Sequence, residues 1–213
     1  MPATARLREI KLVSRSLFPL ACVIVLRALP AFAEDPAPAD RPVPAVGDIF
    51  EYAKSFITVK CARWEVKATG KDGYTLLQCG ENLAYIDAAT DTVARIMAGD
   101  KRLIEFKPRS PTLSFPLQLG KKWSGQYDGY RDDTGASWKS TVACEVTSFE
   151  AIKVAAGEFQ AYRIECADTW ESFPFHGTSP STVWYAPKPG TVVKAVNPAQ
   201  SAFDYELVAY RPK

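Results

Sequence analysis

The stretch CEVTSFEAIKVAAGEFQAYRIEC, residues 144–166, carries the strongest fold signal in this chain. Two runs rich in β-branched and aromatic residues flank a turn sequence at residues 155–157. The midpoint between Cys144 and Cys166 is residue 155, which lies in that turn. An antiparallel hairpin would place the two cysteines opposite each other. The stretch therefore predicts a two-stranded hairpin closed by a disulfide.

Cys61 and Cys79 repeat this pattern nearer the N-terminus. Their midpoint, residue 70, falls within the turn-forming sequence Thr-Gly-Lys-Asp-Gly of residues 69–73. We therefore expect a second hairpin with its own Cys61–Cys79 disulfide.

The remaining cysteine, Cys22, lies within a stretch that resembles an export signal. Its removal would leave four cysteines, for which three pairings are possible, and the two hairpins favour one of them. The spacing C-x-x-C, typical of zinc sites and of redox-active pairs, does not occur. We expect two structural disulfides and an oxidising compartment. The cysteines concerned are Cys61, Cys79, Cys144 and Cys166.

Residues 1–33 have the pattern of a secretory signal peptide. A basic start precedes the apolar run of residues 17–26, and Ala-Phe-Ala at 31–33 supplies a cleavage pattern. The mature chain is therefore expected to begin at Glu34.

Two other interpretations of this N-terminal segment are weaker. Its apolar run is shorter than the roughly 20 residues that a membrane-spanning helix needs. Lipidation of Cys22 is disfavoured because Pro19 stands where an aliphatic residue is expected and because apolar residues follow the cysteine. We expect a periplasmic or secreted protein without a transmembrane segment in the mature chain.

The charge of the expected mature chain excludes one class of function. Five of the 26 basic and one of the 24 acidic residues lie in residues 1–33, which leaves 21 basic and 23 acidic residues and a net charge of −2. A nucleic-acid-binding protein would carry a basic surface. We therefore expect no nucleic-acid partner, and nothing in the charge predicts attraction to anionic lipid.

The pattern of the mature chain predicts an all-β protein. Runs of alternating hydrophobicity recur with turn residues about every 8–12 positions, which predicts an antiparallel curved sheet, open barrel or sandwich. Residues 34–45 are rich in proline and are expected to form a tether. The sequence Lys-Pro-Arg-Ser-Pro at 107–111 predicts a boundary between an N-terminal β subdomain, 46–107, and a C-terminal β domain, 111–213.

Four motifs stand out in the second half of the chain. They are FPLQLGKKW at 115–123, VAAGEFQAYRI at 154–164, WYAPKPGTVVK at 184–194 and FDYELVAY at 203–210. Together they resemble motifs of TapB-like and related bacterial envelope proteins, although the third motif has one more residue before its lysine than the family pattern W-Y-A-P-x-x-G-x-V-K. The resemblance implies a β scaffold and no reaction, so no catalytic residue follows from it.

Catalytic motifs are scarce. His176, the one histidine, could act with Ser179 or Ser181 in a hydrolase, but no G-x-S-x-G sequence is present. A single histidine also excludes a histidine-cluster metal site. We expect no enzyme activity and no cofactor.

Acidic residues offer a second catalytic possibility, because glycoside hydrolysis uses two carboxylates. The candidates are Asp132, Asp133, Asp168 and Glu171. Thr134 and Gly135 follow the adjacent pair, which favours a turn there.

The aromatic segment 170–176 is the candidate binding site. Pro174, Gly177 and Pro180 disfavour strand pairing, so an irregular loop is expected. Its aromatic rings either contact a ligand or partner or fold back to cap the core. The candidate residues are Trp170, Phe173, Phe175 and His176.

These observations favour an exported, non-enzymatic envelope protein whose β scaffold binds a partner or an apolar or glycan ligand. The alternatives are a structural accessory protein with a filled core and a hydrolase. A concave, apolar interior would distinguish a ligand-binding protein from a structural one.

Overall fold

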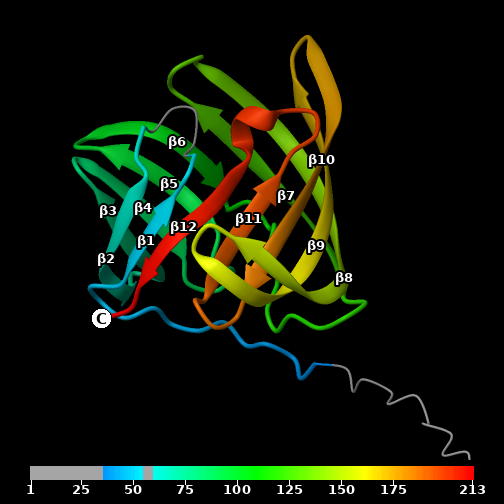
Figure 1. Cartoon of the computed structure of the whole chain (residues 1–213). Helices are drawn as coiled ribbons and strands as arrows, with labels where there is room; N and C mark the ends of the chain where they lie inside the picture. The colour runs from blue at the N-terminus through cyan, green and yellow to red at the C-terminus, as the bar shows by residue number, and fades with distance from the viewer. Residues whose placement is uncertain (1–35, 55–59) are drawn as a thin grey trace, which may run out of the picture. The chain divides into compact units, whose positions relative to one another are not determined.

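The chain folds into an antiparallel barrel (Figure 1). The computed structural model describes residues 36–54 and 60–213, which form twelve strands in one closed sheet. The expected signal peptide, residues 1–33, lies outside the described residues. The strands are β1 (Ile49–Tyr52), β2 (Arg63–Lys71), β3 (Tyr74–Cys79), β4 (Asn82–Asp87), β5 (Val93–Ala98), β6 (Lys101–Lys107), β7 (Lys122–Arg131), β8 (Ala136–Val154), β9 (Gly157–Ser172), β10 (Phe175–Ala186), β11 (Thr191–Val196) and β12 (Tyr205–Arg211).

Each strand pairs with the next strand in sequence, and β12 pairs with β1 to close the barrel, with Phe50 opposite Tyr210. A short 3₁₀ helix, η1 (Ser201–Phe203), lies in the β11–β12 connection. The prediction of an antiparallel all-β fold is confirmed, and the barrel is closed rather than open. Closure satisfies the main-chain groups that the two edge strands would otherwise leave unpaired.

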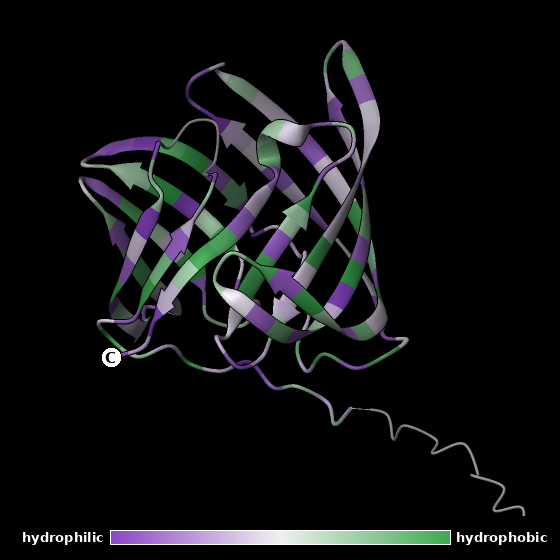
Figure 2. Cartoon of the chain, viewed as in Figure 1, coloured by the Kyte–Doolittle hydropathy of each residue, from purple (hydrophilic) through white to green (hydrophobic). Residues whose placement is uncertain are grey.

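Alternating hydrophobicity sets the two faces of the strands, as Figure 2 shows along the barrel wall. In β8, Val142 and Cys144 are buried, whereas Thr141 and Ala143 are exposed. Successive side chains of a strand point to opposite faces of the sheet. The apolar members of the alternation therefore point into the barrel.

The expected boundary at residues 107–111 does not divide the protein. β6 and β7, which lie on its two sides, are neighbours in the sheet, with Phe106 opposite Gly129. The prolines end β6, but the chain after them folds across one end of the barrel. There Leu113 and Leu117 are buried in the core. The described residues accordingly form one compact unit rather than two subdomains.

The expected tether is also corrected by the structure. Ala39 and Leu117 exchange two main-chain hydrogen bonds of 2.9 and 2.8 Å. The hydroxyl of Tyr162 donates to the carbonyl oxygen of Ala37 at 2.7 Å. An extended, proline-rich segment has main-chain groups free to pair, and here they pair with the 112–119 loop. We call residues 36–47 and 112–119 together the floor of the barrel, because they lie across its lower end in Figure 1.

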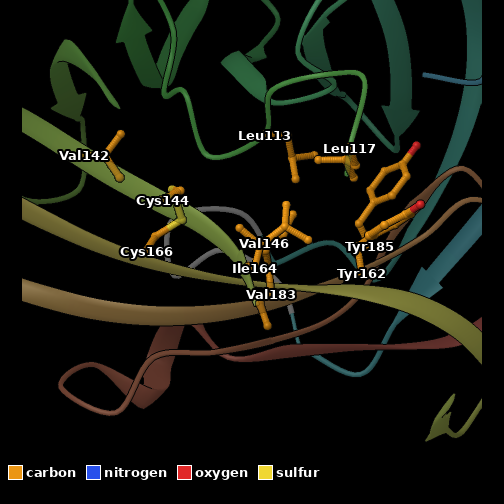
Figure 3. Packing of buried hydrophobic residues seen from close by; sticks show 11 residues of the cluster. Leu113, Leu117, Val142, Cys144, Val146, Tyr162, Ile164, Cys166, Val183 and Tyr185 are labelled. Carbon is orange, nitrogen blue, oxygen red and sulfur yellow. A yellow bond between two sulfur atoms is a disulfide. The ribbon is translucent and has the colours of Figure 1, made fainter. Parts of the chain in front are cut away.

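The floor is joined to the largest part of the core. Figure 3 shows Leu113 and Leu117 near the inward-facing side chains of β8, β9 and β10, among them Val146, Ile164 and Tyr185. All five of these side chains are at most 2% exposed. The floor is therefore an integral part of the hydrophobic core.

The structure contains the two disulfides, Cys61–Cys79 and Cys144–Cys166. Cys144 and Cys166 are directly opposite each other in the β8–β9 ladder. Cys61 precedes β2, and Cys79 ends β3. Each disulfide therefore cross-links the two sides of one hairpin.

Candidate functional site

A cavity of about 630 Å³ lies inside the barrel between β5–β6 and β7–β11. Its volume is in the range of small-molecule binding sites. It extends from Leu113 at the floor to Thr134 and Gln200 at the opposite end, which we call the mouth. Its apolar and aromatic lining consists of Val93, Ile104, Phe106, Leu113, Tyr127, Ala136, Trp138, Trp170, Phe175, Pro180, Val183, Val192, Ala195, Ala199, Phe203 and Tyr205.

A smaller cavity of about 150 Å³ adjoins the first one between β1–β5 and β11. Asp91, Val192 and Tyr205 line both cavities. Phe50, Trp64 and further apolar side chains line the smaller cavity. The barrel interior therefore contains two neighbouring cavities, both lined mainly by apolar side chains.

Two tryptophans near the mouth lie against glycines of the neighbouring strand. A Cβ atom at Gly129 would overlap the indole of Trp138, and one at Gly177 would lie 3.0 Å from the indole of Trp170. At Gly129 no other residue would allow this approach, whereas a side chain at Gly177 would require the indole of Trp170 to shift by a few tenths of an ångström. The Nε1 of Trp170 donates to the hydroxyl oxygen of Ser179 at 3.1 Å, which also fixes the orientation of this indole.

A carboxylate lies among these aromatic rings. Asp168 lines the cavity and accepts a hydrogen bond from the hydroxyl of Tyr127. The other oxygen, Oδ1, is buried and has no hydrogen-bond partner among the described residues. Burial, together with the charge of Asp168, raises the pKa of Tyr127, so this hydroxyl remains a donor. The pair presents a negative charge to a largely apolar space.

A buried ion pair lies at the floor end of both cavities. Arg41 reaches in from the floor and contacts Asp91 Oδ1 with Nη2 at 3.1 Å, while the two side chains are 10% and 12% exposed. The same Nη2 donates to the hydroxyl oxygen of Thr75 at 3.3 Å. Burial raises the pKa of Asp91 to about 7, although the guanidinium of Arg41 opposes this shift. The pair links the N-terminal segment to the β4–β5 turn.

The expected aromatic loop is not irregular. β9 and β10 remain paired up to Ser172 and Phe175, so Trp170 and His176 belong to strands. The prediction of a disrupted pairing was wrong because β11 pairs only with residues 182–186 of β10. Above that point Pro180 lies on a free sheet edge, where a missing N–H group breaks no ladder. The hairpin rises above the rest of the barrel (Figure 1).

The structure divides the four predicted binding residues between two faces. Trp170 and Phe175 line the cavity. Phe173, Phe175 and His176 line a depression of about 670 Å³ beside the hairpin. Phe173 is fully exposed and Phe175 is 70% exposed. The four residues therefore do not form one binding site, and only Phe175 contributes to both spaces.

The hydrolase arrangement is not assembled among the described residues. His176 lines the depression beside the hairpin, whereas Ser179 and Ser181 line the cavity. Alternation along β10 separates the imidazole from both hydroxyls.

The candidate carboxylates are separated as well. Asp132 pairs with Lys101 and Asp133 with Arg131 in and around the β7–β8 turn. No group of three or more potential metal ligands occurs in the part of the chain that the structure describes.

Sequence reasoning missed Arg41, Asp91 and Tyr127. Asp168 was considered only as a catalytic acid, although its separation of two residues from Cys166 places both on the inner face. That alternation was the available signal for Asp168. No comparable signal joins Arg41 to Asp91, because they meet only through the tertiary fold.

The sequence matches no protein-family model, and no curated protein matches it. The resemblance to TapB-like proteins therefore stays a prediction. Among residues 36–54 and 60–213, no helix has the length and apolar character needed to cross a membrane.

Two solved structures are similar in fold. One is a "putative exported protein with YmcC-like fold" from Bacteroides fragilis, with a TM-score of 0.48 and 12% identity over 82% of this chain and 100% of the other. The second is a "putative lipoprotein" from Parabacteroides distasonis, with a TM-score of 0.47 and 10% identity over 83% of this chain and 100% of the other.

Proposed function

We propose that this protein is an exported, non-enzymatic binding protein that holds an apolar or amphiphilic ligand inside its barrel. The observation that carries the proposal is the cavity of about 630 Å³, which is lined mainly by apolar and aromatic side chains. Such a space costs stability unless something fills it, because its lining lacks packing partners. An apolar ligand would supply those contacts.

The location outside the cytoplasm has two independent supports. Residues 1–33 have the pattern of a signal peptide. The two disulfides require an oxidising compartment to form and persist. A periplasmic or secreted carrier satisfies both observations.

The test uses the exported full chain and the apolar fluorescent probe N-phenyl-1-naphthylamine. Ser181→Phe places a ring in the cavity, which Ser181 lines. Ala167→Phe is the matched control, because Ala167 is exposed on the adjacent strand. We expect the wild-type protein and the control to bind the probe with equal affinity. Ser181→Phe should weaken binding by about tenfold, which corresponds to about 1.4 kcal/mol.

Two results would overturn the proposal. One is an absence of probe binding to the wild-type protein, which would favour a structural protein with a filled core. The other is equal binding by both phenylalanine variants, which would place the probe outside the barrel. Mass spectrometry of molecules extracted from the purified protein would then identify the natural ligand if the proposal holds.

A further inference from the structure

The charges that face the larger cavity do not balance. Asp91, Arg131 and Asp168 are the charged residues of its described lining. Asp91 is paired with Arg41, and Arg131 contacts Asp133 at 2.6 Å. Asp168 forms no ion pair within the described ranges. The cavity therefore contains one carboxylate without a cation.

The hydrogen bonding of Asp168 does not compensate for the missing cation. Tyr127 donates to one carboxylate oxygen, and the other oxygen is buried without a partner in the described structure. A carboxylate removed from water is costly unless it is paired with a cation and fully hydrogen-bonded. To this carboxylate, residues 36–54 and 60–213 supply one hydroxyl donor and no ion-pair partner.

Aromatic rings line the same part of the cavity. Phe106 and Tyr127 meet edge to face with their ring centroids 5.6 Å apart, and Phe106 and Trp138 do so at 6.2 Å. Trp170 also lines this space, two residues from Asp168 on the same face of β9, and Phe175 lines the cavity from the hairpin tip, where it is 70% exposed. The faces of aromatic rings attract ammonium groups through the ring quadrupole. The cation–π contacts of the described residues all involve other rings, so these five aromatic rings bind no cation of the protein.

We propose that the cavity selects a cationic amphiphile, whose ammonium group binds beside Asp168 among the aromatic rings and whose apolar part extends toward Leu113 at the floor. This inference rests on the proposed function and specifies the ligand class of the same cavity. The unpaired carboxylate of Asp168 complements the positive charge of the ammonium group, and the aromatic rings contact that group. The apolar side chains nearer the floor contact the apolar chain of the ligand.

The test compares three surfactants with the same ten-carbon chain, each below its micelle concentration, by isothermal titration calorimetry. They are decyltrimethylammonium, tetra(ethylene glycol) monodecyl ether and decyl sulfate. We expect the ammonium compound to bind wild-type protein at least about tenfold more tightly than the neutral one, and decyl sulfate to bind most weakly. Asp168→Asn should abolish the preference for the ammonium compound and leave the affinity for the neutral surfactant unchanged.

Glu171→Gln is the matched control. It removes the same charge three residues away, but Glu171 is exposed and faces the outer depression. It should leave the preference intact. Trp138→Leu removes an aromatic face while keeping the carboxylate, and it should reduce the preference even if Asp168→Asn does not fold.

The possible failures are distinguishable. Equal affinity of the wild-type protein for the three surfactants would overturn the ammonium inference and leave the apolar-cavity proposal standing. A preference that survives Asp168→Asn or is lost in Glu171→Gln would also overturn the inference, because it would place the ammonium group elsewhere. Failure to bind any of the surfactants or N-phenyl-1-naphthylamine would overturn the proposed function itself.

Discussion

The floor and the mouth of this barrel are built in opposite ways. At the floor, Leu113 and Leu117 are at most 2% exposed, and Arg41 enters the interior to pair with Asp91. At the mouth, the β9–β10 hairpin rises above the barrel and exposes Phe173 fully. The difference teaches that a proline-containing, apolar segment can become either buried core, as in the floor, or an exposed strand pair, as in the hairpin. Packing decides which, because both regions are proline-containing and apolar.

The same contrast appears in the buried carboxylates, although the buried hydroxyl of Tyr185, which packs in the cluster of Leu117, also has no hydrogen-bond partner among the described residues. At the floor, main-chain groups of Ala39 and Leu117 satisfy each other, and the buried guanidinium has its carboxylate. Nearer the mouth, Asp168 retains an oxygen without a partner among the described residues. Buried polar groups that a fold leaves unsatisfied are candidates for ligand contact. We therefore assign stability mainly to the floor and recognition mainly to the upper cavity.

The largest effect is expected from truncating the floor. Leu117→Ala removes a fully buried side chain from the main core cluster, and it should lower the free energy of unfolding by roughly 2–5 kcal/mol. Val43→Ala is the control in the N-terminal part of the floor, because Val43 is 67% exposed. Urea denaturation measures both. A loss below 1 kcal/mol for Leu117→Ala would show that the floor is not part of the folding core.

A somewhat smaller effect is expected from breaking the floor ion pair. Arg41→Met leaves Asp91 buried without its cation and should cost about 3 kcal/mol. The double variant Arg41→Met/Asp91→Asn removes both charges and should recover part of that loss. Denaturation of the single and double variants gives the coupling between the two residues. Additive losses would mean that the two side chains do not interact in solution.

The free energy of unfolding should depend on pH because the carboxyl group of Asp91 has a raised pKa in the folded state. Burial raises the pKa of Asp91 to about 7, so the folded state binds more protons at this site than the unfolded state between about pH 4 and 7. Asp91 therefore favours folding at low pH, and this contribution is lost as the pH rises through that window. The unfolding free energy of Asp91→Asn should accordingly rise relative to wild type from pH 4 to pH 7. An unchanged difference would contradict the raised pKa.

The smallest effect is expected at the hairpin tip. Phe173→Ala should change the free energy of unfolding by no more than about 0.5 kcal/mol, because the side chain is fully exposed and has no packing to lose. Thermal and chemical denaturation both measure this. A loss of 2 kcal/mol or more would show that Phe173 folds back onto the barrel, which would remove the contrast between floor and mouth.

The sequence predicted the features that depend on local pattern. Alternating hydrophobicity indicated antiparallel strands, and the turn between Cys144 and Cys166 indicated their opposition in one hairpin. Both signals arise from residues close in sequence, whose geometry follows from the period of a strand and the size of a turn. The Cys61–Cys79 hairpin was predictable for the same reason, because its turn also lies midway between its two cysteines.

Non-local contacts escaped prediction. The proline-rich segment 34–45 has no periodicity that identifies a partner, so its pairing with Leu117 could not be anticipated. The prolines near residue 108 indicated a break in a strand, but the two strands beside them are sheet neighbours. The prediction of disrupted pairing at Pro180 failed for the same reason. Whether a proline disrupts a sheet depends on which edge of its strand is hydrogen-bonded, and the tertiary fold decides that.

By itself, the sequence determined that this chain forms disulfide-joined antiparallel hairpins and has the pattern of an exported protein. Only the tertiary structure decided that β12 meets β1, that residues 36–47 complete the floor, and that Asp168 faces an aromatic cavity. The physical reason is the range of the interactions. Turns and alternation act over a few residues, whereas closure and packing join side chains and main-chain groups that are far apart in the chain.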